Sequence, residues 1–361
     1  MINLIQQFYE YYYEDKDLTE IEQFRKENKL QPYRIKQIFF EIFKNVRIDF
    51  KDMTTLSKEL RKKLSENFEI LSLKPIKVLD SSDTTKIAFE TKDWYIIESV
   101  IMYHKWRVTL CVSSQVWCPV WCAFCVTWKL GFTRNLSYDE IISQLIFANR
   151  YIRKKLGKKE DGTWWAVRNI VFMWMWEPLL NYENVKKSIL IMLDQKAFSL
   201  SRRRITISTS WIIPWIEKLI QDKLPVMLAV SLHAPNQSLR EKLIPIAKKY
   251  SLDSLIQILN RYIEETDNRL FYEYIMIKDI TDTPELAYQL AQLIRWQKAH
   301  INLIPYNENP TIDFKESSWD RILKFKEILE SEGITVTIRD SLWRDIKGAC
   351  WQLWYELIKN D

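Results

Sequence analysis

Glycine is scarce in this 361-residue chain. It contains 5 glycines, whereas an average share of about 7% would give roughly 25. Tryptophan is over-represented, with 16 residues. Glycine is the usual residue wherever a backbone turns with positive φ or passes close to a ligand. The shortage therefore leaves the chain without the common residue for tight turns and ligand loops.

Long hydrophobic runs and targeting signals are also missing. No stretch approaches the ~18 uninterrupted apolar residues of a membrane span. Residues 1–15 lack the basic segment, apolar stretch and cleavage site of a signal peptide. We therefore expect a cytoplasmic protein without a membrane partner. In that reducing compartment the 5 cysteines are more typical of ligands or catalysts than of disulfides. The net charge of +6 permits an RNA partner without requiring one.

The periodicity of apolar residues indicates an α/β fold. Helical patterns occur at 17–28, 33–45 and 54–68, and strand patterns begin near residue 84. Strands and helices then alternate to residue 339, and a capping box from Ser137 to Glu140 opens the helix over 141–156. Such alternation predicts a parallel sheet with helices outside it, either open or closed into a full or partial barrel. Ligands of such folds bind at the carboxyl ends of the strands.

Three cysteines follow one of these predicted strands. Cys118, Cys122 and Cys125 have the spacing C-x3-C-x2-C. Three thiolates do not complete a tetrahedral zinc site, whereas a 4Fe-4S cluster held by three thiolates leaves one iron open to an exogenous ligand. The spacing, with Phe124 before the last cysteine, resembles the cluster motif of radical S-adenosylmethionine (SAM) enzymes. Structural zinc and unliganded core cysteines are the alternatives.

A narrower resemblance covers more than two-thirds of the chain. The motifs of the RlmN/Cfr family of radical SAM RNA adenine methyltransferases resemble, in order, residues 110–136, 172–185, 205–211, 229–246, 302–307 and 345–354. Residues 31–45 and 49–64 resemble the accessory domain of the RlmN branch.

The resemblance implies an α/β fold, a radical SAM partial (β/α)6 barrel with a small N-terminal helical accessory domain. The expected parts are an RNA-contacting domain over 1–80, the barrel with its strand extension over 81–343, and a C-terminal segment over 344–361 that carries the methyl-accepting cysteine.

The resemblance also implies how the chemistry is divided among the residues. Carbon 2 of adenine is electron-poor and carries a hydrogen that no protein base removes directly, so a cysteine carries the methyl group first. In this sequence Cys350 would be that carrier and Glu98 the proton acceptor. Cys111 would attack the sulfur of Cys350 and release the product through a transient disulfide. Without the resemblance, Cys111 would be read as a core cysteine and Glu98 as a solvated strand residue. The sequence around Cys350 would favour neither a structural nor a catalytic role.

The cofactors implied are a 4Fe-4S cluster on Cys118, Cys122 and Cys125, and two molecules of SAM per turnover. The residues expected to bind SAM, by their match to the family motifs, are Trp176, Glu177, Ser208, Ser231, Leu232, His233 and Asn307. A carboxylate such as Glu177 can accept charge-assisted hydrogen bonds from the ammonium group of SAM. Taken alone, His233 is more typical of a structural histidine.

The function expected from the resemblance is methylation of adenine carbon 2 in 23S rRNA, at the peptidyl-transferase centre, and in tRNA, 3′ of the anticodon. We expect a monomer that receives electrons from an external flavodoxin- or ferredoxin-like donor. Candidates for RNA contact are Lys129, Arg134 and the arginines at 202–204, although a charge run is usually a solvated face. The rivals are a Cfr-like carbon-8 methyltransferase and a catalytically degenerate RNA-binding homologue.

Tryptophan stands at many positions where the family has glycine. The resemblance places Trp94, Trp106, Trp117, Trp121, Trp128, Trp174, Trp176, Trp211, Trp343, Trp351 and Trp354 at such positions. An indole opposes positive φ and close approach of a ligand. One hypothesis covers both compositional anomalies: the gene reads UGA as glycine, and the printed sequence reads it as tryptophan. The alternative is a degenerate, inactive homologue.

This hypothesis predicts the intact mass of the native protein. Each misread codon makes the printed chain heavier by the difference between tryptophan and glycine, so mass spectrometry of the natural protein should give a mass lower by a whole multiple of that difference. Agreement with the printed sequence would rule the hypothesis out and favour the degenerate homologue.

Overall fold

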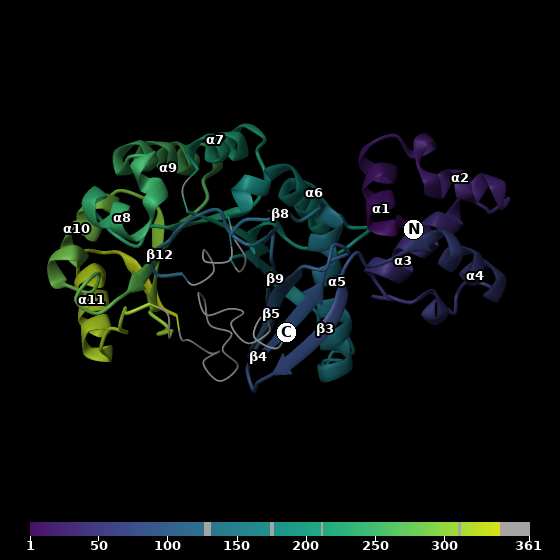
Figure 1. The fold of residues 1–361 in the computed structure, drawn as a ribbon, viewed down its shortest axis with the longest axis horizontal. Helices are drawn as coiled ribbons and strands as arrows, with labels where there is room; N and C mark the ends of the chain where they lie inside the picture. Colours follow the sequence, from purple (N-terminus) through teal and green to yellow (C-terminus); the bar gives the residue numbers. More distant parts are fainter. Residues whose placement is uncertain (126–130, 174–176, 211, 310–311, 340–361) are drawn as a thin grey trace.

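The fold is that of a computed structural model, which describes residues 1–125, 131–173, 177–210, 212–309 and 312–339. Within these ranges no helix is long and apolar enough to cross a membrane. The chain begins with a small helical region at one end of the molecule and continues into a large α/β part (Figure 1).

The N-terminal region is built from short amphipathic helices around an aromatic core. Its elements are β1 (Ile2–Asn3), α1 (Leu4–Tyr13), α2 (Glu20–Glu27), α3 (Tyr33–Phe43), α4 (Lys58–Asn67) and β2 (Phe68–Glu69). Asn3 caps α1 by accepting hydrogen bonds from the N–H groups of Ile5 and Gln6. Phe8 packs against Phe39 and Phe43 with ring centroids 5.1 and 4.5 Å away. The pairing of β1 with β2 closes this region on itself.

A mixed sheet forms the centre of the α/β part. Its strands are β3 (Lys74–Asp80), β4 (Thr84–Glu90), β5 (Ile96–His104), β6 (Arg107–Cys111), β9 (Val167–Phe172), β10 (Ile205–Thr209), β11 (Met227–Ser231), β12 (Leu270–Met276), β13 (Ala299–Pro305) and β14 (Thr335–Ile338). Their order in the sheet is β14-β13-β12-β11-β10-β9-β6-β5-β4-β3. Every pairing from β6 to β14 is parallel, and β3, β4 and β5 extend the sheet antiparallel.

Helices follow most of the parallel strands and cover the outside of the sheet (Figure 1). They are α5 (Tyr138–Leu156), α6 (Tyr182–Leu193), α7 (Ile213–Gln221), α8 (Gln237–Leu243), α9 (Leu252–Thr266), α10 (Pro284–Ile294) and α11 (Trp319–Ser331). The predicted capping box of α5 is present, with Ser137 and Glu140 in the expected roles. The architecture confirms the predicted α/β fold with a helical N-terminal region.

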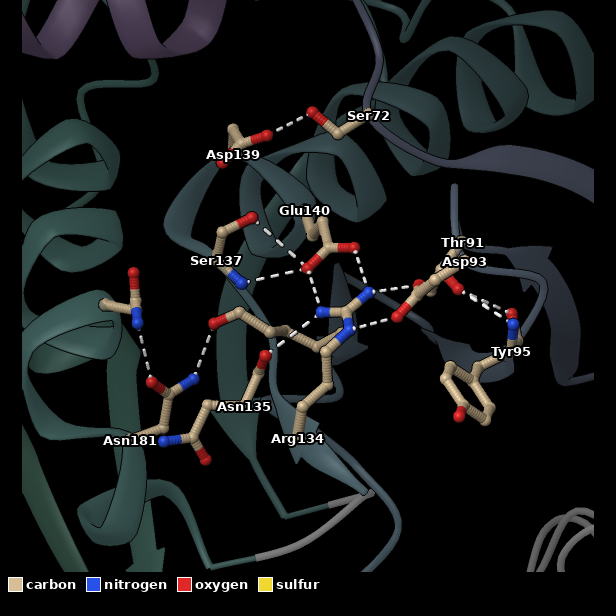
Figure 2. A network of polar contacts seen from close by, with 12 residues as sticks. Ser72, Thr91, Asp93, Tyr95, Arg134, Asn135, Ser137, Asp139, Glu140 and Asn181 are labelled. Atoms are coloured by element: carbon tan, nitrogen blue, oxygen red, sulfur yellow. Dashed lines mark hydrogen bonds and ion pairs between the residues drawn. The ribbon is translucent and has the colours of Figure 1, made fainter.

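A polar network joins the N-terminal region to the start of α5. Asn3 donates to Ser72 over 2.8 Å, Ser72 donates to Asp139, and Gln6 donates to Asp139 over 3.0 Å. Asn3, Ser72 and Asp139 are all buried, so each of these hydrogen bonds replaces water at a dry interface. The contact between Ser72 and Asp139 lies above the capping box in Figure 2.

Two exposed tryptophans in neighbouring turns differ in backbone conformation. Trp94, between β4 and β5, has φ 68° and is 78% exposed. Trp106, between β5 and β6, is 79% exposed and is not among the described residues with positive φ. Of the two, only Trp94 therefore occupies the left-handed region that glycine adopts without cost.

Replacing Trp94 with glycine should stabilise the protein. The left-handed region costs a residue with a Cβ about 1–2 kcal/mol, and the extra freedom of unfolded glycine offsets about 0.5–1 kcal/mol of the gain. We expect Trp94→Gly to raise the free energy of unfolding by about 0.5–1 kcal/mol in urea titrations. Trp106→Gly, the matched control, should not raise it, and an equal gain in both variants would contradict the assignment to backbone strain.

Candidate active site

The predicted site residues lie at the carboxyl-terminal edge of the parallel strands. Cys111 is the last residue of β6, and Glu177 follows β9 as the cap of the short helix η4 (Pro178–Asn181). Ser208 lies in β10 and Ser231 ends β11. Asn307 follows β13 by two residues. Because parallel strands end on one side of a sheet, residues far apart in the sequence are brought to one edge.

The cysteine loop leaves this edge after β7 (Gln115–Val116) and returns at β8 (Arg134–Asn135), which pairs with it. Inside the loop, the N–H of Val120 donates to the sulfur of Cys118 over 3.2 Å, and Ala123 donates to the carbonyl of Leu243 over 2.8 Å. The N–H of Cys125 donates to the carbonyl of Cys122 over 3.1 Å. The bond from Ala123 to Leu243 holds the loop against the segment that follows β11, and the other two bonds shape the loop itself.

The three loop cysteines share one electrostatic environment. Burial raises the pKa of Cys118 and of Cys122, and in both cases the charge of Cys125 raises it further. Thiolates there need a cation to remain charged, which an iron-sulfur cluster provides. Among the described residues no three His, Cys, Asp or Glu side chains surround a point for one metal ion. Three thiolates that each bind a different iron fit a 4Fe-4S cluster.

Buried aromatic and charged side chains pack behind the cysteine loop. Phe124 packs edge-on against His233 with centroids 4.9 Å apart. His233 has φ 56° and accepts a hydrogen bond from the N–H of Ile275 over 3.2 Å. Burial and, secondarily, the charge of Arg240 lower the pKa of His233 to about 3. His233 is therefore neutral and its Nδ1 is already used, so it contributes shape and backbone conformation rather than charge.

Arg240 is a site residue that the sequence reasoning missed. It is 0% exposed, and burial lowers its pKa while the neighbouring Cys122 raises it. A buried guanidinium beside a set of thiols compensates their negative charge. Arg240 lies in the short helix α8 (Gln237–Leu243), and nothing in the local sequence pattern indicates that its side chain is buried.

Glu177 and Asn307 present polar atoms at the same edge. One Glu177 oxygen accepts from the N–H and the hydroxyl of Ser210, over 2.5 and 2.6 Å, and the other accepts from the N–H of Leu179 over 3.2 Å. Burial raises the pKa of Glu177 and these hydrogen bonds oppose the rise. The side-chain oxygen of Asn307 is buried and has no hydrogen-bond partner among the described residues. Such an orphaned acceptor fits a donor from a ligand such as SAM.

Leu232 completes the predicted SAM segment as a structural residue. Its side chain is 0% exposed, and its N–H donates to the carbonyl of Glu273 over 3.0 Å. Ser208 and Ser231 are half-buried at the strand ends. A polar hydroxyl at the edge of the sheet can contact a ligand, whereas Leu232 fixes the course of the chain between Ser231 and His233.

Glu98 and Cys111 face the inside of the partial barrel. Cys111 pairs with Val100 across β5 and β6, and Glu98 lies two residues from Val100, so all three side chains are on one face of the sheet. The same face bears Met102 and Thr109, which line a cavity of about 810 Å³. Glu98 and Cys111 are 1% and 3% exposed. The alternative interpretation of Glu98 as a solvated strand residue is therefore wrong, because its face of β5 is covered.

Arg134 is engaged within the protein. It donates to both oxygens of Asp93 over 2.7 Å and to both oxygens of Glu140 over 2.8 Å, and it donates to the carbonyl of Asn135 over 3.0 Å. Figure 2 shows its guanidinium between the two carboxylates. The paired guanidinium holds the pKa of Asp93 far below its usual range. Arg134 therefore ties the β4–β5 turn to α5, and two carboxylates compensate its charge.

Trp117, the residue before the first loop cysteine, does not suit its place. It has φ 61°, and its indole N–H is buried without a hydrogen-bond partner among the described residues. Both features carry a cost that glycine would not. Cys350, Trp176 and Lys129 lie outside the described residues, as do Trp128, Trp174, Trp211, Trp343, Trp351 and Trp354.

The chain is similar to a known family model and to several known proteins. Residues 14–70 match a family model described as "Ribosomal RNA large subunit methyltransferase N-terminal domain". The chain is 42% identical over 328 residues to the "Probable dual-specificity RNA methyltransferase RlmN" of Dictyoglomus turgidum, covering 91% of this chain and 92% of the relative. It is 41% identical to the protein of the same name from Aquifex aeolicus, covering 90% and 91%.

A solved structure is similar over nearly the whole chain. The crystal structure of a radical SAM methyltransferase from Sphaerobacter thermophilus superposes with a TM-score of 0.86 at 38% sequence identity. The superposition covers 92% of this chain and 96% of that protein.

Proposed function

This chain belongs to the RlmN family of radical SAM RNA methyltransferases, and we propose on that premise that it methylates carbon 2 of an adenine in 23S rRNA, at the peptidyl-transferase centre, and in tRNA, 3′ of the anticodon. As a radical SAM enzyme it uses SAM and an iron-sulfur cluster. The observation that carries the proposal is the convergence, at one sheet edge, of the cysteine loop with Glu177, Ser231 and Asn307.

We assign the cluster to Cys118, Cys122 and Cys125, as a 4Fe-4S cluster with one iron open to SAM. When bound, it would supply the electron that cleaves SAM. Glu177 and the orphaned oxygen of Asn307 are placed to accept hydrogen bonds from SAM. Support for the remaining SAM contacts, Trp176, Ser208, Ser231, Leu232 and His233, comes from the family match and, where described, from their place at the same edge.

The barrel interior is assigned to the methyl-transfer chemistry. Cys350 receives a methyl group from one SAM, and a second SAM serves the radical step, so two are used per turnover. The carbon carried by Cys350 bonds to carbon 2, and the proton on carbon 2 passes to Glu98. Cys111 then attacks the sulfur of Cys350, and the electron pair of the broken sulfur–carbon bond goes to the carbon on RNA, which takes up a proton to become the methyl group. The disulfide left between Cys111 and Cys350 is reduced to two thiols by two electrons from an external donor. The shared face of Glu98 and Cys111 in a covered interior supports these roles.

The division of the chain follows the same proposal. Residues 1–80 would contact RNA, residues 81–343 would form the barrel with its strand extension, and residues 344–361 would carry Cys350. The match of residues 14–70 to the RlmN N-terminal domain supports the first assignment. We propose a monomer that is reduced by a flavodoxin- or ferredoxin-like donor.

The nucleoside product tests the function. We expect reconstituted enzyme, SAM and reductant to convert unmodified 23S rRNA and tRNA to RNA that contains 2-methyladenosine, identified by chromatography of digested nucleosides against standards. 8-Methyladenosine would instead identify a Cfr-like enzyme. No methylated adenosine, with intact iron and SAM binding, would identify a degenerate RNA-binding homologue.

The role of Cys111 predicts a trapped intermediate. Cys111→Ala should still methylate Cys350 and attack RNA, but it lacks the thiol that resolves the bond, so a covalent protein–RNA adduct should accumulate in denaturing gels. Cys350→Ala is the matched control and should form neither adduct nor product. Continued turnover by Cys111→Ala would contradict the assigned role.

A further inference from the structure

Lys86 of β4 is the cation that faces Glu98 inside the protein. Its Nζ lies 3.3 Å from Glu98 Oε1, and the two side chains are 11% and 1% exposed. Apart from this ion pair, neither carboxylate oxygen of Glu98 has a hydrogen-bond partner among the described residues. Within the described part of the chain, Lys86 is therefore the direct partner of the Glu98 carboxylate.

Strand register brings the two residues together. Lys86 pairs with Val100, and Ala88 pairs with Glu98, so Lys86 and Glu98 are diagonal neighbours on one face. Lys77 of β3 pairs with Ala88 on the same face, but its side chain is exposed. On the other side of β5, the side chain of Cys111 in β6 lies on the same face. Lys86, Lys77 and Cys111 are thus the titratable groups that adjacent strands present toward Glu98.

Two opposing effects act on Glu98. Burial raises its pKa, Lys86 and then Lys77 oppose the rise, and the net result is a pKa of about 7. A carboxyl group with such a pKa is partly ionised at neutral pH and becomes a stronger base than an exposed glutamate. Loss of the facing cation would leave burial unopposed, and the neutral form would dominate.

We propose that Lys86 is a positioning residue for methyl transfer, which holds Glu98 ionised in the barrel so that Glu98 can take the proton from carbon 2 of the adenine after that carbon has bonded to the carbon carried by Cys350. The proton moves to a carboxylate oxygen of Glu98, and the electron pair of the carbon–hydrogen bond stays with the adenine ring. The inference deepens the proposed function and rests on the role given there to Glu98.

Four variants of the full chain separate charge from packing. Lys86→Met keeps the length of the side chain and removes its charge, and Lys86→Arg keeps the charge. Lys77→Met removes the exposed cation on the same face and is the matched control. Glu98→Gln removes the titrating group and identifies its signal.

The first measurement is independent of catalysis. Infrared difference spectra recorded across a pH series follow the carbonyl band of protonated Glu98, which is the band missing in Glu98→Gln. We expect the midpoint near pH 7 in the wild type, about one unit higher in Lys86→Met, and within a few tenths of the wild type in Lys86→Arg and Lys77→Met. Equal midpoints in the wild type and Lys86→Met would overturn the inference.

The second measurement is the pH profile of single-turnover RNA methylation. A rise of one unit leaves about a tenth of Glu98 ionised at pH 7 instead of half, so Lys86→Met should lose about fivefold in rate at pH 7 and recover it above about pH 9. A loss that does not recover at high pH would contradict the charge role. Full activity of Glu98→Gln would instead refute the proposed proton acceptor, while the infrared midpoints would still report on Lys86.

Discussion

Parallel pairing of the strands from β6 to β14 is the constraint on which the site depends. It directs the ends of β6, β9, β10, β11 and β13 to one edge, so a cysteine loop, a capping glutamate, a serine and an asparagine meet there without being neighbours in sequence. The antiparallel strands β3, β4 and β5 extend the same face sideways. They add Lys86 and Glu98 to the interior, beside Cys111.

Burial shifts the pKa of the few carboxyl groups in the interior. Glu98, Glu177 and Glu273 are each less than 5% exposed, and in each case burial raises the pKa of the carboxyl group. The three carboxylates differ in the groups that stabilise their negative charge. Glu177 is held by hydrogen bonds from Ser210 and Leu179, and Glu273 by Arg339 and Asn302. Among the described residues, Glu98 has one direct partner, the ammonium of Lys86. A carboxylate with a single partner is the one most free to change its protonation state.

Much of the fold can be predicted from local sequence patterns. The rest depends on strand register between segments that are distant in sequence. The capping box at Ser137 and the alternation of strands and helices were readable because both depend on neighbouring residues. Helix α1 was missed because its consecutive aromatic residues obscure the helical period. Lys86 and Arg240 could not be recognised, because their importance comes from strands and loops distant in sequence. The pairing of Arg134 with Asp93 is hidden in the sequence for the same reason, because the two residues are 41 positions apart.

The clamp around Arg134 has a consequence for the entropy of the cysteine loop. The pairing of β7 with β8 and the hydrogen bond from Thr133 to Val116 join the two ends of the cysteine loop. The Arg134 guanidinium, held by Asp93 and Glu140, fixes the β8 end to the β4–β5 turn and to α5. A loop closed at its base has already lost much of its chain entropy. Closure at the base therefore lowers the further entropy that the loop would lose on binding a ligand.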